Sequence, residues 1–233
     1  MARTHRGFAW LLAGLVVAGA PALASGRPLI EFRVEEGGKV RGRYDMGIVR
    51  NEGMTFVVGN FYPGAQALKG KKRGKPEHRL YGELDAAGAL GKYKRWVRHG
   101  GDQEYWMAFL FKDEVKLRHE DVEGGKGQVK TLGKAAGAAP MDPGMPALAW
   151  ALLGEKPAPR EVACAGTTAG AWGTARVVDK GTVEVDDGDG GKASLAHWRV
   201  EGDCGTVDLF LDADGKPRRM QAGERTYERF VRK

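Results

Sequence analysis

The stretch LDAAGALGKYKRWVR, residues 84–98, decides the fold class of this chain. Asp85 and Gly88 are typical of a tight turn, because an aspartate side chain bonds back to the turn backbone and glycine tolerates a positive φ. After the turn the residues alternate, with Tyr93 and Val97 on one face and the lysines on the other. This alternation predicts a strand that leaves a turn and buries one of its faces.

Short extended segments of the same kind, separated by glycine and aspartate turns, recur along the chain. A second Asp…Gly turn, at 212–215, is also followed by a basic segment. Further alternating or β-branched and aromatic segments lie at 29–34, 54–58, 60–62, 105–111, 174–185, 193–200, 206–211 and 227–231. This spacing predicts an antiparallel β protein.

One helix is expected within this pattern, over Ala147–Leu153. Asp142 is a candidate capping residue, Pro143 or Pro146 suits the first turn, and Gly154 ends the helix. Every side of the segment is apolar, and a helix without a polar face is buried on all sides. We therefore expect a sheet that curves around this helix.

The predicted architecture is one mostly-β domain over residues 25–233, long enough to bury a single core. Its sheet is a strongly curved antiparallel sheet, a half-barrel, with one short buried helix. Connectors near residues 133–159 carry the helix to the concave side of the sheet.

The first 24 residues have the features of a secretory signal peptide. Two arginines precede an apolar run at 7–20, and the small residues of Ala22–Ala24 form a cleavage site. The run is shorter than the ~20 residues of a membrane-spanning helix. Ser25 stands where a lipoprotein would have cysteine, so no lipid anchor is expected. We predict cleavage before Ser25 and a periplasmic or secreted protein with no integral membrane segment, an uncut anchor being the alternative.

Charge and cysteine content agree with such a location. The chain carries a net charge of +7, and a basic balance favours anionic partners. Export makes nucleic acid the least expected of them. The two cysteines, Cys164 and Cys204, are an even count, which in an oxidising compartment usually means a disulfide. A reactive cysteine is the alternative.

Recognisable catalytic and metal-binding patterns are absent from the sequence. Beyond Ser25, serine occurs only at Ser194, which has no flanking glycine elbow. The histidines show no HxH, HxxxH or HExxH spacing of a zinc site. Asp186–Gly191 lacks the carboxylate spacing of a calcium loop and is interpreted as a flexible acidic hairpin, with a low-affinity calcium contact as the alternative. We expect no enzymatic activity, no metal and no cofactor.

An apolar run at Tyr105–Phe111 is the first candidate binding feature. It suits either a central strand buried on both faces or a strand that lines a groove for an apolar ligand. In the second interpretation it shares the groove with the helix. The candidate groove residues are Tyr105, Met107, Phe109, Phe111, Leu148, Trp150 and Leu152.

A basic loop is the second candidate. It suits either a solvated hairpin loop or a contact with an anionic envelope surface, to which each cation near a charged membrane contributes ~1 kcal/mol. Its candidate contact residues are Lys69, Lys71, Lys72, Arg73 and Lys75.

The turn at 85–88 and the basic segment Lys92–Arg95, in an exported chain of many short strands with one short apolar helix, resemble lipoprotein-carrier-like half-barrel proteins of the bacterial periplasm. Exported members of unknown function are the most similar. The resemblance implies an antiparallel sheet curled around a helical plug and the binding of lipids or lipoproteins. It assigns no site residue, because it includes no diagnostic motif.

The expected function is non-catalytic binding of an apolar or amphipathic envelope molecule, such as a lipid or a lipoprotein-like ligand. The alternative is a structural or protein-interaction module of the cell envelope without a ligand cavity. A cavity lined by apolar side chains favours the first, and a filled core with an exposed apolar patch favours the second.

Overall fold

The computed structural model describes residues 29–51, 53–69, 75–86, 88–99, 102–111, 114–121, 128–134, 138–166, 171–186 and 191–230. The strands before the helix are β1 (Ile30–Glu36), β2 (Lys39–Asn51), β3 (Met54–Pro63), β4 (His78–Asp85), β5 (Leu90–His99), β6 (Asp102–Phe111), β7 (Glu114–Asp121), β8 (Gln128–Lys134) and β9 (Ala139–Met141). The strands after it are β10 (Arg160–Gly166), β11 (Ala171–Asp186), β12 (Lys192–Gly202), β13 (Gly205–Leu211), β14 (Pro217–Ala222) and β15 (Arg225–Arg229). The helices are α1 (Ala147–Leu153) and a 3-10 turn, η1 (Ala65–Leu68).

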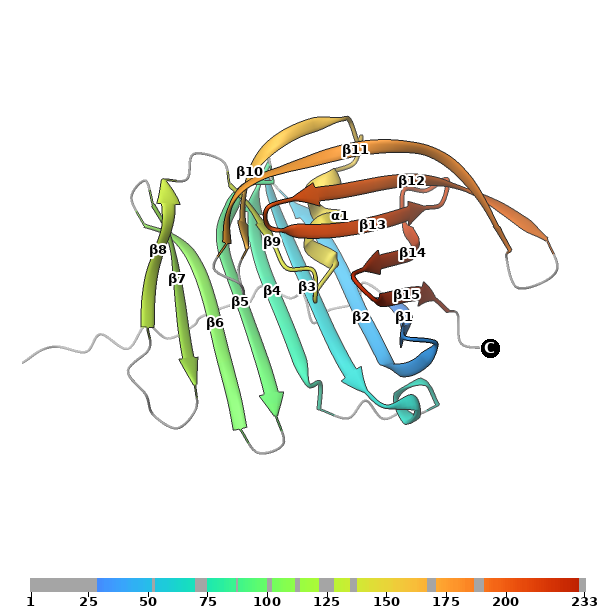
Figure 1. The fold of residues 1–233 in the computed structure, drawn as a ribbon, viewed down its shortest axis with the longest axis horizontal. Helices are drawn as coiled ribbons and strands as arrows, with labels where there is room; N and C mark the ends of the chain where they lie inside the picture. The colour runs from blue at the N-terminus through green and yellow to red at the C-terminus, as the bar shows by residue number, and fades with distance from the viewer. Residues whose placement is uncertain are drawn as a thin grey trace, which may run out of the picture.

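All described strands belong to one sheet, in the order β8-β7-β6-β5-β4-β3-β2-β1-β15-β14-β13-β12-β11-β10-β9. Neighbouring strands are antiparallel except β9 and β10, which are parallel. The end strands β8 and β9 do not pair with each other, so the described sheet is not closed (Figure 1). The prediction of a mostly-β, antiparallel, curved sheet is confirmed.

The strand and turn at 84–98 form as the sequence predicts. The Asp85 carboxylate accepts the Ala89 backbone N–H at 2.8 Å, and Gly88 has a φ of +84°. Tyr93 and Val97 on β5 are buried in the core. Period-two alternation and turn chemistry therefore determine this part of the sheet.

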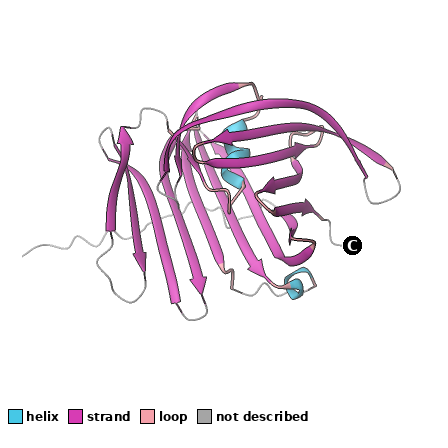
Figure 2. Cartoon of the chain, in the orientation of Figure 1, coloured by secondary structure: helices cyan, strands magenta, loops and turns pink. Residues whose placement is uncertain are grey.

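The sheet curves around α1, which lies on its concave side (Figure 2). Six of the seven helical residues are buried, as the prediction of an all-apolar helix requires. A Cβ on Gly82 of β4 would lie 3.3 Å from Leu148 Cδ2, so this glycine lets the helix pack close to the sheet. On the neighbouring strand β5, the Leu90 N–H donates to the Ala138 carbonyl at 2.8 Å, which links β5 to the segment entering β9.

The prediction that Asp142 caps the helix is wrong. Pro146 is the N-cap residue, and no side chain caps the helix. The Asp142 carboxylate is buried and instead receives Arg95 Nη1 at 2.9 Å and the Tyr93 hydroxyl at 2.6 Å. The Gly144 N–H also donates to it at 3.0 Å. A buried cation and two further donors satisfy this carboxylate, so it fastens the loop before α1 to β5 rather than capping the helix.

The predicted disulfide is present, with 6.2 Å between the Cα atoms of Cys164 and Cys204. It crosses β11, because Cys164 lies on β10 and Cys204 in the turn between β12 and β13. Gly173 on β11 makes room for this turn, since a Cβ there would lie 2.1 Å from the Asp203 carboxylate. The Asp203 N–H donates to the Thr174 carbonyl at 3.0 Å, which holds the turn against β11.

A histidine extends the polar contacts of Asp142 toward the surface. Arg95 Nη2 lies 2.9 Å from His78 Nδ1, and His78 Nε2 lies 2.9 Å from the Glu77 carboxylate. Burial and the positive charges of Arg95 and Arg225 lower the pKa of His78, and Glu77 opposes this shift. His78 is therefore harder to protonate in the folded protein than in the unfolded chain.

We expect the His78 contribution to stability to be lost on acidification. Because the folded pKa lies below the ordinary value of 6.5, this contribution is present above pH 6.5 and is lost as the pH falls through the folded pKa. Urea unfolding at about pH 7.5 and about pH 5.5 measures the loss. His78→Gln keeps a polar side chain without this titration, so its free energy of unfolding should fall less over the same interval. An equal fall in both proteins would contradict the assignment.

Candidate functional site: an apolar pocket at Trp150

The sheet has an interruption beside β2. Strand β1 pairs with β2 only from Ile30, which lies opposite Met46, onward. Strand β2 continues to Asn51 and keeps its pairing with β3 over that length. Within the described residues, no strand pairs with 47–51 on the side where β1 lies. The wall of the half-barrel is therefore open at this edge of β2.

A cavity of about 520 Å³ lies at this opening. Its volume is within the range of about 300–1,000 Å³ typical of small-molecule sites. Apolar side chains from β1, β2, β3, α1 and β13 make most of its wall, and charged groups stand beside them. The lining residues are Leu29, Ile30, Gly47, Ile48, Val49, Arg50, Val58, Trp150, Gly154, Glu155, Pro157, Leu211, Asp214, Gly215 and Lys216.

Trp150 is the contribution of the helix to this cavity. It is the one residue of α1 that is only half-buried. Its indole Nε1–H donates to the Gly215 carbonyl at 3.1 Å, which fixes the ring against the β13–β14 turn. Asp212 holds this turn in place, because its carboxylate accepts the Asp214 and Lys216 N–H groups at 3.1 and 2.9 Å. The ring thus has a defined position with one apolar side toward the cavity.

Arg50 gives the cavity a polar group. Its Nη2 atom is buried and has no hydrogen-bond partner among the described residues. A buried guanidinium nitrogen without an acceptor is costly, and an acceptor on a ligand would satisfy it. Glu155, Asp214 and Lys216 are exposed at the same cavity. The chemistry suits a molecule with a large apolar part and one polar or anionic end.

The structure does not place the predicted groove residues on one common surface. Leu148 and Leu152 are packed in the core, so among the helical candidates only Trp150 lines this pocket. Ala108 of β6 is buried, and the residues on either side of it, Met107 and Phe109, face away from the core because side chains alternate along a strand.

Tyr105 shares the face of Met107 and Phe109, and its hydroxyl donates to the Met107 sulfur at 3.4 Å. The Trp96 ring lies 5.6 Å from the Tyr105 ring on this convex face. The side chain of Phe111 lies outside the described residues. The structure therefore does not bring the apolar run of β6 and the helix onto one surface, and β6 lies near an end of the sheet rather than at its centre.

The basic loop is described only at its two ends. Lys69 and Lys75 are exposed, whereas Lys71, Lys72 and Arg73 lie outside the described residues. Lys75 lines a separate hollow of about 380 Å³, to which Arg79, Trp96 and Arg98 also contribute. Residues 187–190 of the acidic hairpin also lie outside the described part of the chain.

The β2 side of the pocket has no direct sign in the linear sequence. Ile48 and Val49 belong to a strand whose apolar residues are interspersed with charged ones, so its pattern is not a plain alternation. Within the strand, Arg43 and Asp45 are fully buried and pair with each other at 2.8 Å. The position of Leu29 over Gly47, 2.8 Å from a Cβ placed there, depends on tertiary packing alone.

Comparison with known proteins gives no match to a protein-family model, to a curated protein or to a solved structure. Among the described residues, no group of three or more His, Cys, Asp or Glu side chains is placed to hold a metal ion. No helix in the described part of the chain has the length and apolar character needed to cross a membrane. The interpretation of the pocket therefore rests on its geometry and chemistry.

Proposed function

We propose that this protein binds a small amphipathic molecule of the cell envelope in the Trp150 pocket, without catalysis. The observation that carries the proposal is the cavity of about 520 Å³ at the unpaired edge of β2. A filled half-barrel would leave no such space beside its helix. The apolar wall contacts the apolar part of the ligand, and Arg50 donates a hydrogen bond to its polar end.

The predicted signal peptide and the disulfide support an envelope location. A disulfide persists in an oxidising compartment, and lipids with one polar end are abundant there. The resemblance to lipoprotein-carrier-like half-barrels points to the same class of ligand. Binding in the pocket would bury the apolar part of such a molecule against Trp150 and Ile48.

A protein-interaction module of the envelope is the second proposal. The observation that favours it is the convex face of β5 and β6, where half-buried Trp96, Tyr105 and Met107 lie beside basic residues. Lys94 is directly opposite Met107 in the sheet, and Arg118 is on its other side. Aromatic residues, Met and Arg are enriched at protein interfaces.

Trp150→Ala tests the first proposal. It removes the indole that forms one wall of the pocket, so we expect the affinity for an environment-sensitive apolar dye to fall about tenfold, the effect of losing ~1.4 kcal/mol of contact. Dye fluorescence titration measures the affinity. Far-UV circular dichroism should keep the β-sheet signal, because Trp150 is at the margin of the core.

Trp96→Ala is the matched control, since it removes the same side chain from the convex face. It should leave dye affinity unchanged if the Trp150 pocket is the binding site. No dye uptake by the wild-type protein, or an equal loss in the two variants, would contradict the carrier proposal. A loss confined to Trp96→Ala would favour the interaction module.

A further inference from the structure

The convex face extends from β5 and β6 over the neighbouring strands β3, β4 and β7, which lie side by side (Figure 1). One row of side chains runs in register from Val58 on β3 through Tyr81, Lys94 and Met107 to Arg118 on β7. Each of these residues is next to a buried core residue along its own strand, so the row lies on the face that points away from the core. All five are at least partly exposed.

The cations of β4 and β5 on this face lack acidic partners. Among the described residues, the side chains of Arg79, Lys92, Lys94 and Arg98 form no ion pair. Glu83, which is opposite Lys92, accepts the Tyr81 hydroxyl at 2.7 Å. Burial and the charge of Lys92 lower the pKa of Lys94, and Glu83 opposes this shift. An external anion would relieve the repulsion between the two lysines.

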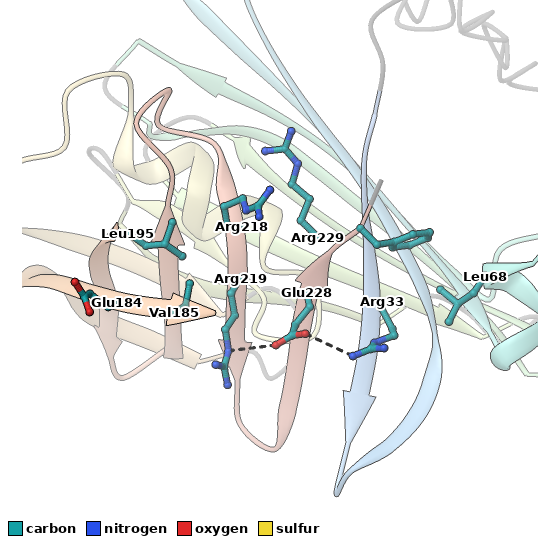
Figure 3. A pocket seen from close by; sticks show the side chains of 10 residues that line it. Arg33, Leu68, Glu184, Val185, Leu195, Arg218, Arg219, Glu228 and Arg229 are labelled. Atoms are coloured by element: carbon teal, nitrogen blue, oxygen red, sulfur yellow. Dashed lines mark ion pairs between the residues drawn. The ribbon is translucent and has the colours of Figure 1, made fainter. Parts of the chain in front are cut away.

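Elsewhere on the outer surface, arginines have their counter-ions within the protein. At a hollow of about 880 Å³ beside β1, β14 and β15, the Glu228 carboxylate lies 3.5 Å from Arg33 Nη2 and 4.0 Å from Arg219 Nε (Figure 3). Arg33 Nε is also 3.0 Å from the Glu35 carboxylate. The cations of β4 and β5 differ from these, because a partner outside the described residues has to neutralise them.

Amphipathic side chains stand beside the free cations. Trp96 and Tyr105 are neighbours on the convex face, and Met107 and Phe109 follow Tyr105 along the same face of β6. Tryptophan and tyrosine are enriched where a bilayer meets water, because their rings have an apolar body and a polar tip. Lysine lays its apolar stem along such a surface while its ammonium group reaches the headgroups. The combination suits the boundary between lipid headgroups and chains.

The row that contains Lys94 begins at the mouth of the Trp150 pocket. Val58, its first member, lines that pocket together with Leu29 and Gly47. Gly47 is opposite Val58 in the sheet. The convex face is therefore continuous with the mouth of the pocket.

We infer that the convex face of β3–β6 docks on an anionic lipid surface, with Lys92 and Lys94 at the headgroups. The same face carries the protein-interaction proposal, and its continuity with the Trp150 pocket favours lipid, because a carrier has to reach the membrane that holds its ligand. In this respect the inference rests on the proposed carrier function. The unpaired cations support it independently, since each gains from an anionic surface.

Co-sedimentation of the protein, without its predicted signal peptide, with lipid vesicles tests this inference. We expect binding to vesicles of phosphatidylcholine and phosphatidylglycerol in equal amounts, and little binding to pure phosphatidylcholine. Lys92→Gln/Lys94→Gln should lower the partition constant for the anionic vesicles about thirtyfold, which corresponds to ~2 kcal/mol for two cations. Both lysines are partly exposed and unpaired, so the variant should keep the circular dichroism signal of the wild type.

Lys39→Gln/Lys180→Gln is the matched control. It lowers the net charge by the same amount at two exposed lysines, on β2 beside the β1–β2 turn and on β11, which form no ion pair with a described residue. It should bind the anionic vesicles as the wild type does. An equal loss in the two double variants would show that net charge, rather than this face, drives binding, and would overturn the inference.

Two other results also overturn it. Equal binding to the two kinds of vesicle removes the electrostatic argument, and absence of binding to anionic vesicles leaves the face to a protein partner. Trp150→Ala should bind vesicles as the wild type does, because Trp150 lies in the pocket and not on this face. Vesicle binding by a protein that takes up no dye would contradict the carrier function alone, whereas dye uptake without vesicle binding would contradict the docking surface alone.

Discussion

Asp142→Asn is expected to lower the free energy of unfolding by about 3–5 kcal/mol, the cost of removing one partner from a buried ion pair. Asparagine keeps the size of the side chain and removes its charge. Arg95, whose side chain is 13% exposed, would then lie beside α1 without its carboxylate. Urea unfolding followed by circular dichroism measures the change.

The double variant Arg95→Met/Asp142→Leu is the control for this prediction. Replacing a buried pair with apolar residues of similar size is often close to neutral, so the double variant should be more stable than Asp142→Asn. This difference separates the cost of an unpaired charge from a general intolerance of substitution at the loop before α1. A double variant less stable than Asp142→Asn would show that packing, rather than charge, dominates there.

Cys164→Ala/Cys204→Ala is expected to lower the free energy of unfolding by about 3–4 kcal/mol. The bridge spans a sequence separation of 40 residues, and the chain-entropy model gives a closure of this length a stabilisation of about that size. The wild-type protein should lose a similar amount on reduction, while the variant should not respond to reductant. A variant as stable as the oxidised wild type would contradict the prediction.

The position of the bridge also predicts which strands lose local stability when the bridge is removed. The bridge joins β10 to the β12–β13 turn, so hydrogen exchange should accelerate more in β10–β13 than in β2–β5. The side chain of Pro143 lies 2.3 Å from a Cβ placed on Gly205 of the same turn. The bridge therefore also supports the loop that carries Asp142. When Asp142→Asn is combined with Cys164→Ala/Cys204→Ala, the loss in free energy of unfolding should be smaller than the sum of the two separate losses.

Local chemistry explains which parts of the fold the sequence predicts. The turn at Asp85 and the alternation of β5 depend on residues within a few positions of each other, and both are confirmed. The helix over Ala147–Leu153 was predicted with its bounds, because its apolar run and Gly154 define it locally. The disulfide followed from a count of two cysteines.

Longer-range packing explains what the sequence did not predict. Arg43 and Asp45 are charged residues inside the buried part of β2, so this strand had no clear alternation. Asp142 was assigned to the nearest helix because its true partner, Arg95, is 47 positions away in the chain. The pocket at Trp150 is formed by strands that are distant in sequence and by an edge that β1 leaves unpaired, and neither is visible in a linear pattern.

The pairing of β1 with β15 has a consequence for how the chain folds. Phe32 lies opposite Arg229, so the middle of the sheet joins the first described strand to the last. Contacts of such high sequence separation raise the contact order, and chains of high contact order fold slowly because a long loop must close before these contacts form. The two halves of the sheet can be joined only after β15 has been synthesised. A chain shortened by its last strand would expose β1 and β14 as unpaired edges, the kind of surface through which β proteins aggregate or exchange strands.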